Sequence, residues 1–436
     1  MIAIRYKEAL AKIGMEPEKR KIILSTLEHT LNSLLPEALI RGKVGYDGKS
    51  ISIDGKKFDV EGKIYVIGTG KAAGAMAQSI EGLIPVEKGI VSVPKGTAKN
   101  FKCEKIELLE ASHPFPDEGS VIAATRMIDL SAEVTAKDLV VCLISGGGSS
   151  LLALPSEGIT LEEKISVAKK VMAAGADIWE LNSVRKSLSA IKGGKLAMHF
   201  KRSRLINIVL SDVLGNPLPV IASGPTILDR YTYAAAKDVL EKYSLWDPDE
   251  NFCKVIEKGI VVGALPLNME KVHPKISNFI IGDNNFGIEL ASDFLRKSGF
   301  KVKCLQEITG DAKDVGKKLA QLLNKGESFV AGGETTVAVR GDGIGGRNQE
   351  LALSAALHMK KGTLASIGTD GVDGVSDAAG AIVDFGTKEK AKIAGMNISE
   401  YLNLNDSNTF FKNLKDGLIM TGPTGTNVCD LIIGIA

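Results

Sequence analysis

The sequence predicts an α/β protein with two α/β domains, mainly parallel sheets covered by helices, and an active site in the cleft between the domains. Short apolar segments such as 138–144 and 204–210 alternate with helical runs. Strands without polar alternation need helices on both faces of a parallel sheet. The alternation pauses and then restarts, so we place the domains at residues 1–245 and 246–436. The length of 436 residues fits about two or three domains of ~150 residues each.

The individual elements follow from the spacing of the apolar residues. Apolar positions at helical intervals between Ile22 and Leu35 predict a helix in the first 40 residues. In the first domain we expect strands at 63–67, 89–93, 138–144 and 204–210, with a helix at 71–83. After a helical segment at 232–261, a second series begins with strands at 277–281, 301–305, 327–331 and 363–367 and helices at 285–298, 311–324 and 346–360.

Composition excludes several classes of protein. There are 54 Lys and Arg against 52 Asp and Glu, and this near balance argues against a dedicated nucleic-acid binder. The five cysteines are far apart and form no C-x-x-C pair, which is typical of a reducing compartment. No segment approaches the ~20 apolar residues of a membrane-spanning helix. We therefore expect a cytoplasmic protein with small-molecule partners, no nucleic acid and no membrane, in which a homodimer is allowed.

The 47 glycines concentrate where strands end and helices begin. In parallel sheets, ligands bind beyond the carboxyl ends of the strands. The first such loop, Gly68–Gly74, contains Gly70 and Lys71, and the free N–H groups of the next helix favour an anion there. Its spacing is neither that of a Walker A loop nor that of a dinucleotide fingerprint. The alternative is a tight turn with a solvated lysine.

A second loop is a run of glycines flanked by serines. Backbone N–H groups and hydroxyls in such a run suit a phosphate or a carboxylate. We expect anion binding there rather than a merely flexible turn, by Ser145, Gly146, Gly147, Gly148 and Ser149.

The loop after strand 204–210 begins with Asp212 and contains prolines that hold it in place. Asp212 is a candidate metal ligand or general base, and its alternative role is to cap a turn.

Comparable loops recur in the second domain. Glu334 and Thr335 follow strand 327–331 as candidate substrate or phosphate ligands. A glycine-rich loop ends at Arg347 and Asn348, where a helix begins. Arg347 opposes the helix dipole, which is favourable if it meets a bound anion, and its alternative is an exposed arginine.

Three carboxylates spaced by glycines follow strand 363–367. Asp370, Asp373 and Asp377 lack EF-hand spacing but could converge on Mg²⁺ held together with substrate phosphates. The alternative is a series of Asp-Gly turns. The histidines lack metal-ligand spacing. His113 follows a strand, and we expect it to be a packed loop histidine, with contact to the substrate as the alternative. Anion sites, two cations and an acidic set are together what phosphoryl transfer requires.

These motifs resemble a known family. Nearly the whole chain is similar to two-domain glycerate 2-kinases whose C-terminal half is a MOFRL domain. The resemblance rests on V-I-G-T-G-K-A-A (66–73), A-S-H-P-F-P-D (111–117), L-I-S-G-G-G-S-S (143–150), L-S-D-V-L-G-N-P (210–217), S-G-P-T (223–226), G-G-E-T-T-V (332–337), G-G-R-N-Q-E (345–350), G-T-D-G-V-D-G-V-S-D-A-A-G (368–380) and T-G-P-T-G-T-N-V (421–428).

The resemblance implies ATP- and Mg²⁺-dependent phosphorylation of D-glycerate at its 2-hydroxyl, with Lys71 and Arg347 as the active-site cations. We expect Lys71 to neutralise the glycerate carboxylate or the phosphoryl group, Arg347 to stabilise transition-state charge, and Asp212 to orient the hydroxyl. Three alternatives stay open. They are an NAD(P)H-dependent hydroxypyruvate reductase, a kinase of a related hydroxy acid, and a non-catalytic anion-binding protein.

Overall fold

The computed structural model describes residues 1–229, 232–262 and 275–436. The chain divides into two units: unit 1 contains Met1–Leu39 and Gly282–Ala436, and unit 2 contains Ile40–Ile281. This division differs from the expected domains, because the first 39 residues pack with the C-terminal half. It also places the segment 277–281, predicted to open the second domain, in the sheet of unit 2.

The sheet of unit 2 has six strands in the order β6-β5-β4-β7-β8-β9. The pairs from β6 to β8 are all parallel, as the buried apolar runs predict. The carboxyl ends of β4, β7 and β8 therefore lie side by side. The strands are β4 (Ile64–Thr69), β5 (Val86–Pro94), β6 (Ile106–Ala111), β7 (Leu139–Ser145), β8 (Arg204–Leu210) and β9 (Ile276–Gly282). A separate antiparallel sheet contains β1 (Val44–Tyr46), β2 (Ser50–Ile53) and β3 (Lys56–Asp59).

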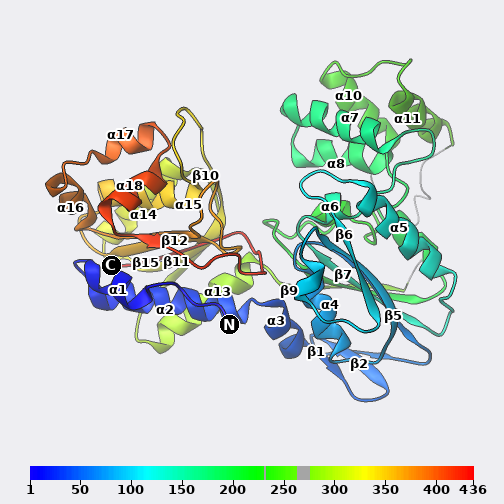
Figure 1. Cartoon of the computed structure of the whole chain (residues 1–436), viewed down its shortest axis with the longest axis horizontal. Coiled ribbons are helices and arrows are strands. Elements are labelled where there is room, and N and C mark those ends of the chain that lie inside the picture. The colour runs from blue at the N-terminus through cyan, green and yellow to red at the C-terminus, as the bar shows by residue number, and fades with distance from the viewer. Residues whose placement is uncertain (230–231, 263–274) are drawn as a thin grey trace. The chain divides into compact units, whose positions relative to one another are not determined.

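Helices follow the strands of unit 2, and some of them form a separate apolar cluster. Apolar side chains of four helices pack against one another. Figure 1 shows these helices grouped beside the sheet of unit 2. These four are α7 (Leu161–Ala173), α8 (Ile178–Ser187), α10 (Tyr233–Lys242) and α11 (Asn251–Val262). The other helices are α4 (Ala73–Glu81), α5 (Glu118–Ser131), α6 (Gly148–Leu151) and α9 (Lys195–His199).

Unit 1 has a six-stranded sheet of order β10-β11-β15-β12-β13-β14. Only its β10–β11 pair is parallel among the described pairs, and β15 is antiparallel to both β11 and β12. The predicted mainly parallel pairing is therefore absent from most of this sheet, because the chain returns from β12 to β13 without a crossover helix. The strands are β10 (Lys303–Asp311), β11 (Phe329–Thr336), β12 (Thr363–Gly368), β13 (Gly380–Asp384), β14 (Leu418–Ile419) and β15 (Asp430–Ile435).

Helices cover both faces of the unit 1 sheet. Apolar residues of α2 (Pro17–Ser33) and α13 (Asn284–Lys297) pack on one face, and those of α14 (Ala312–Asn324) and α15 (Arg347–His358) pack on the other. The remaining helices are α1 (Lys7–Ile13), α3 (Pro36–Lys43), which runs into unit 2, α16 (Thr387–Ile393), α17 (Ile398–Asn403) and α18 (Ser407–Leu414). None of the described helices has the length and apolar character needed to cross a membrane.

A buried ion network holds the N-terminal helices to the rest of unit 1. Arg20 of α2 is fully buried, and its Nε lies 2.7 Å from Asp384 Oδ2 while its Nη1 lies 2.7 Å from Asp416 Oδ1. Because a buried guanidinium needs carboxylate partners, the N-terminal segment is bound to residues more than 360 positions away. Sequence spacing alone could not predict this pairing.

Candidate active site

The loop that carries Lys71 docks on the glycine-rich loop that follows β7. Lys71 N donates to Gly146 O at 2.8 Å, and Ala72 N donates to Ser145 Oγ at 3.0 Å. The approach is so close that a Cβ at Gly70, whose φ is 136°, would lie 2.1 Å from Ser145 Oγ. The structure thus brings together the first two predicted anion-binding loops, and glycine is required at the contact.

Three side chains with useful chemistry gather over the Gly146–Gly147 turn. A Cβ built on Gly146 would lie 1.7 Å from Asp212 Oδ2, and one built on Gly147 would lie 3.1 Å from both Lys71 Cγ and His113 Cδ2. Lys71 is exposed, whereas burial and then the charge of Lys71 lower the pKa of His113. His113, predicted to be a packed loop histidine, therefore belongs to this cluster as a neutral imidazole at pH 7.

The rest of the glycine-rich loop is fixed by packing and hydrogen bonds. Gly148 begins α6, and a Cβ there would lie 2.8 Å from both Thr69 Cγ2 and Ala222 Cβ. Ser149 Oγ lies 2.9 Å from Ser223 Oγ, which in turn donates to Asn182 Oδ1 at 2.8 Å. The glycine-rich loop 145–149 is thus a preorganised turn rather than a flexible one.

A cavity of about 310 Å³ opens beside this turn. Gly147, Ser149 and His113 line it together with three cations, Lys164, Arg185 and Lys192. Burial lowers the pKa of Lys192 to about 7 and lowers the pKa values of Lys164 and Arg185. We call this space the basic cavity. Sequence reasoning missed its three cations, although Lys164 lies on the apolar face of α7, three residues from Leu161 and from Val167.

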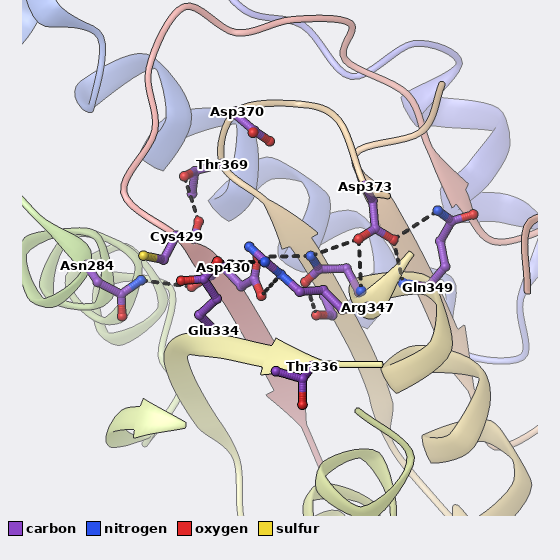
Figure 2. Close-up of polar contacts among 12 residues, drawn as sticks. Asn284, Glu334, Thr336, Arg347, Gln349, Thr369, Asp370, Asp373, Cys429 and Asp430 are labelled. Carbon is purple, nitrogen blue, oxygen red and sulfur yellow. Dashed lines mark hydrogen bonds and ion pairs between the residues drawn. The ribbon is translucent and has the colours of Figure 1, made fainter. Parts of the chain in front are cut away.

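In unit 1, Arg347 is held by carboxylates of its own chain (Figure 2). Arg347 Nε and Nη2 donate to the two oxygens of Asp430 at 2.7 and 2.9 Å, and Nη1 donates to Glu334 Oε1 at 2.7 Å. Burial raises the pKa of Asp430 to about 6 in spite of Arg347. Burial opposes the charge of Arg347 as well, but Asp430 and Glu334 raise its pKa. Both members of the buried pair are therefore charged at pH 7.

Asp373 faces the start of α15. Its carboxylate accepts from Asn348 N at 3.0 Å, from Gln349 N at 2.9 Å and from both side-chain amides. Asn348 Nδ2 also donates to Asp430 Oδ1 at 3.0 Å, and Asn348 Oδ1 accepts from Ser366 at 2.6 Å. The hydrogen bonds of Asp373 and Asn348 therefore hold the start of α15 and the Asp430 carboxylate that pairs with Arg347. These groups are not free to bind a ligand.

The three aspartates predicted to bind magnesium are not gathered into one site. Asp373 caps α15, and Asp377 is exposed beside Lys412, with Nζ 3.5 Å from Oδ1. Asp370 accepts from Val372 N at 3.2 Å, and Figure 2 draws no contact from it to the other residues shown. Across the described residues, no group of three or more His, Cys, Asp or Glu could hold a metal ion. Only Asp370 and Asp373 line the same cavity.

That second cavity, which we call the acidic cavity, has a volume of about 750 Å³. Arg347, Asp370 and Thr335 line it. Thr335 Oγ1 is buried without a hydrogen-bond partner among the described residues. An unsatisfied hydroxyl in a cavity wall is available to contact a ligand, and the ligand role of Thr335 stays a prediction.

Comparison with known proteins finds two family matches along the chain. Residues 22–257 match the family described as a domain of unknown function (DUF4147), and residues 327–430 match the MOFRL family. A glycerate 2-kinase of Pyrococcus horikoshii is 37% identical, over 95% of this chain and 97% of its own. A protein of Agrobacterium vitis called putative hydroxypyruvate reductase is 36% identical over 84% of this chain and 97% of its own.

A solved structure is also similar. The crystal structure of a glycerate kinase from Thermotoga maritima has a TM-score of 0.85 and 33% sequence identity, covering 95% of this chain and 98% of that one. Because two family models match along the chain and a glycerate 2-kinase of nearly equal length aligns with 95% of it, the chain belongs to the two-domain glycerate 2-kinase family with a C-terminal MOFRL domain.

Proposed function

We propose that the protein phosphorylates D-glycerate at its 2-hydroxyl, with ATP as donor and Mg²⁺ as cofactor, and produces 2-phosphoglycerate and ADP. The observation that carries this proposal is the cluster of Lys71, His113 and Asp212 over the Gly146–Gly147 turn. It combines a cation with two proton acceptors that follow β4, β6 and β8 of one sheet of parallel strands. The relatives named glycerate 2-kinase support the same activity.

The two cavities differ in size in a way that supports one assignment of the substrates. Glycerate has few atoms and suits the turn of unit 2 and its cavity of about 310 Å³. A nucleotide needs more space and suits the cavity of about 750 Å³ in unit 1, where apolar Val337 and Val375 join Thr335 in the wall. In this assignment Thr335 Oγ1 and Glu334 contact the nucleotide.

Magnesium fits this assignment through a single protein carboxylate. Asp370 lines the larger cavity, and Mg²⁺ is commonly held by one or two carboxylates together with substrate phosphates. When bound, Mg²⁺ neutralises charge on the phosphates. Asp373 and Asp377 have no part in this proposal, because α15 and Lys412 occupy their carboxylates.

The residues of the chain then have distinct roles. The 2-hydroxyl oxygen forms a bond to the γ-phosphorus, the bond from that phosphorus to the ADP oxygen breaks, and the hydroxyl proton passes to Asp212 or to neutral His113. Lys71 supplies positive charge next to the acceptor. Arg347 stabilises charge on the equatorial phosphoryl oxygens, and Asp430 and Glu334 fix its orientation.

A product assay tests the proposed reaction. The protein is incubated with Mg·ATP and D-glycerate, ADP is measured, and ³¹P and ¹³C NMR identify the phosphorylated carbon. We expect 2-phosphoglycerate, and no ADP when magnesium is omitted. A parallel reaction with NADH or NADPH and hydroxypyruvate tests the reductase named for the Agrobacterium vitis relative. Consumption of the reduced cofactor without ADP formation from glycerate would replace the kinase by the reductase.

A further inference from the structure

The basic cavity of unit 2 contains more positive charge than its protein surroundings neutralise. Lys164, Arg185 and Lys192 all line it, and no Asp or Glu does. Lys192 is 2% exposed and Lys164 is 5% exposed, so water compensates little of their charge. A buried cation usually has an anionic partner, because removing it from water costs several kcal/mol.

The hydrogen-bond partners of these cations are neutral. Lys164 Nζ donates to Arg185 O at 2.9 Å and Leu188 O at 2.7 Å. Lys192 Nζ donates to Leu152 O at 3.1 Å and lies 3.5 Å from Ala222 O. These carbonyls hold the two amino groups in place, and they supply no full negative charge to balance either group when it is protonated.

Of the three cations, Arg185 makes the fewest side-chain hydrogen bonds among the described residues. Its Nη2 lies 3.8 Å from Met172 Sδ, and no carboxylate of the described chain pairs with it. Its neighbour Lys186, in contrast, pairs with Asp229. The planar guanidinium therefore remains available for the two-point contact that it makes with carboxylates.

The position of the cavity determines which part of the substrate it would contact. Gly147 lines the basic cavity and also lies beneath Lys71 and His113. Gly147 adjoins Gly146, over which Asp212 lies, so a small ligand with its anionic group beside Gly147 would extend toward His113 and Asp212. In glycerate, the carbon next to the carboxylate carries the 2-hydroxyl.

We propose that the basic cavity binds the carboxylate of a small 2-hydroxy acid, with Arg185 as its main contact and Lys164 and Lys192 as the supporting charges. This inference rests on the proposed function, and it explains why the 2-hydroxyl of glycerate is the one phosphorylated. Holding the carboxylate in the cavity presents the adjacent 2-hydroxyl rather than the 3-hydroxyl. Neutral polyols such as glycerol, which lack the anion, are excluded from the substrate class.

The variant Arg185→Gln tests this site while leaving the carbonyl-bound lysines intact. We expect its Kd for D-glycerate, measured by isothermal titration without nucleotide, and its KM for D-glycerate to rise roughly 10- to 100-fold. The KM for ATP should stay unchanged. Added guanidinium chloride at millimolar concentration should restore part of the glycerate affinity. The matched control is Arg126→Gln, because Arg126 is an exposed arginine of the same unit that pairs with Glu107 and lies outside the cavity.

The outcomes separate this inference from the proposed function. Unchanged glycerate affinity in Arg185→Gln, with wild-type unfolding, would overturn the carboxylate site. Tighter binding of inorganic phosphate than of glycerate to the wild type, lost in Arg185→Gln, would also overturn it and identify a phosphate site. If the wild type binds D-glycerate through Arg185 but releases no ADP, the carboxylate site stands and the kinase proposal fails.

Discussion

The two cavities contain similar cations in opposite electrostatic settings. In unit 2, Lys164, Arg185 and Lys192 line a cavity without a carboxylate. In unit 1, Arg347 is clamped by Asp430 and Glu334. A cation without a counter-ion has its charge available for a ligand. A paired cation is held in position by its carboxylates, and these partly cancel its positive electrostatic potential. The comparison indicates that unit 2 attracts an anion and that unit 1 orients an arginine within an acidic wall.

The largest expected effects come from removing one cation of each unit. Lys71→Ala and Arg347→Ala should each lower kcat by on the order of 100-fold or more, because each removes charge stabilisation from the transition state. Their effects on folding should differ. Arg347→Ala leaves Asp430 buried without its partner and should lower the free energy of unfolding by about 3–5 kcal/mol. Lys71 is exposed, and its removal should change stability by less than about 0.5 kcal/mol.

Urea unfolding of both variants, beside steady-state kinetics, checks this contrast. The conservative variant Arg347→Lys serves as the control, because it keeps the charge and loses the two-point contact with Asp430. Equal stability of Lys71→Ala and Arg347→Ala would show that Arg347 is not held as described.

Smaller effects on stability and magnesium dependence should distinguish Asp373, which caps α15, from Asp370, which lines the acidic cavity. Asp373→Ala leaves the amides of Asn348 and Gln349 at the start of α15 without their acceptor, which should cost about 2 kcal/mol of unfolding free energy. Asp370→Ala should leave stability unchanged and raise the magnesium concentration needed for half-maximal rate. Thermal unfolding and a magnesium titration measure both. Loss of magnesium dependence in Asp373→Ala at full stability would restore Asp373 as a metal ligand.

The pH dependence of kcat/KM should differ between D-glycerate and ATP. Burial lowers the pKa of Lys192 from its ordinary 10.5 to about 7, so its positive charge is present below pH 7 and is lost as the pH rises through it. We expect kcat/KM for D-glycerate to fall as the pH rises through 7 and then to level off, since this ratio reports the free enzyme and Arg185 remains charged. The value of kcat/KM for ATP should not show this fall, which we call the alkaline limb. In Lys192→Arg the limb should disappear, because a guanidinium stays protonated, and its persistence there would assign the limb to another group.

The smallest effect is expected at Asp377. Its side chain is 66% exposed and pairs with exposed Lys412. Asp377→Ala should therefore change stability by less than about 0.5 kcal/mol and leave kcat unchanged. A loss of rate in this variant would revive the three-aspartate magnesium site.

The sequence predicted the parts of the site that depend on local spacing. Glycines after buried strands located the loops of Lys71 and Gly147, and parallel pairing of β4 with β7 brings their ends together. Asp212 follows β8, which pairs with β7. Contacts over long sequence distances were not predictable. Asp430 comes 83 residues after Arg347, and only the antiparallel insertion of β15 beside β11 explains their meeting.

The cations of the basic cavity were missed for a related reason. Lys164 and Arg185 lie on α7 and α8, whose apolar cluster contains no residue of the glycine-rich loop 145–150. On a helix, a lysine or arginine normally extends to water, and the sequence carries no direct sign that it is buried. The division into units was likewise misplaced, because the buried partners of Arg20 determine where the first 39 residues pack.

A crystal structure of the protein with D-glycerate and a non-hydrolysable ATP analogue tests the central claim most directly. We predict that the glycerate carboxylate lies about 3 Å from the Arg185 guanidinium in the basic cavity, with the 2-hydroxyl facing Asp212 and His113. Glycerate bound instead in the acidic cavity, with its carboxylate on Arg347, would contradict the assignment of the two cavities.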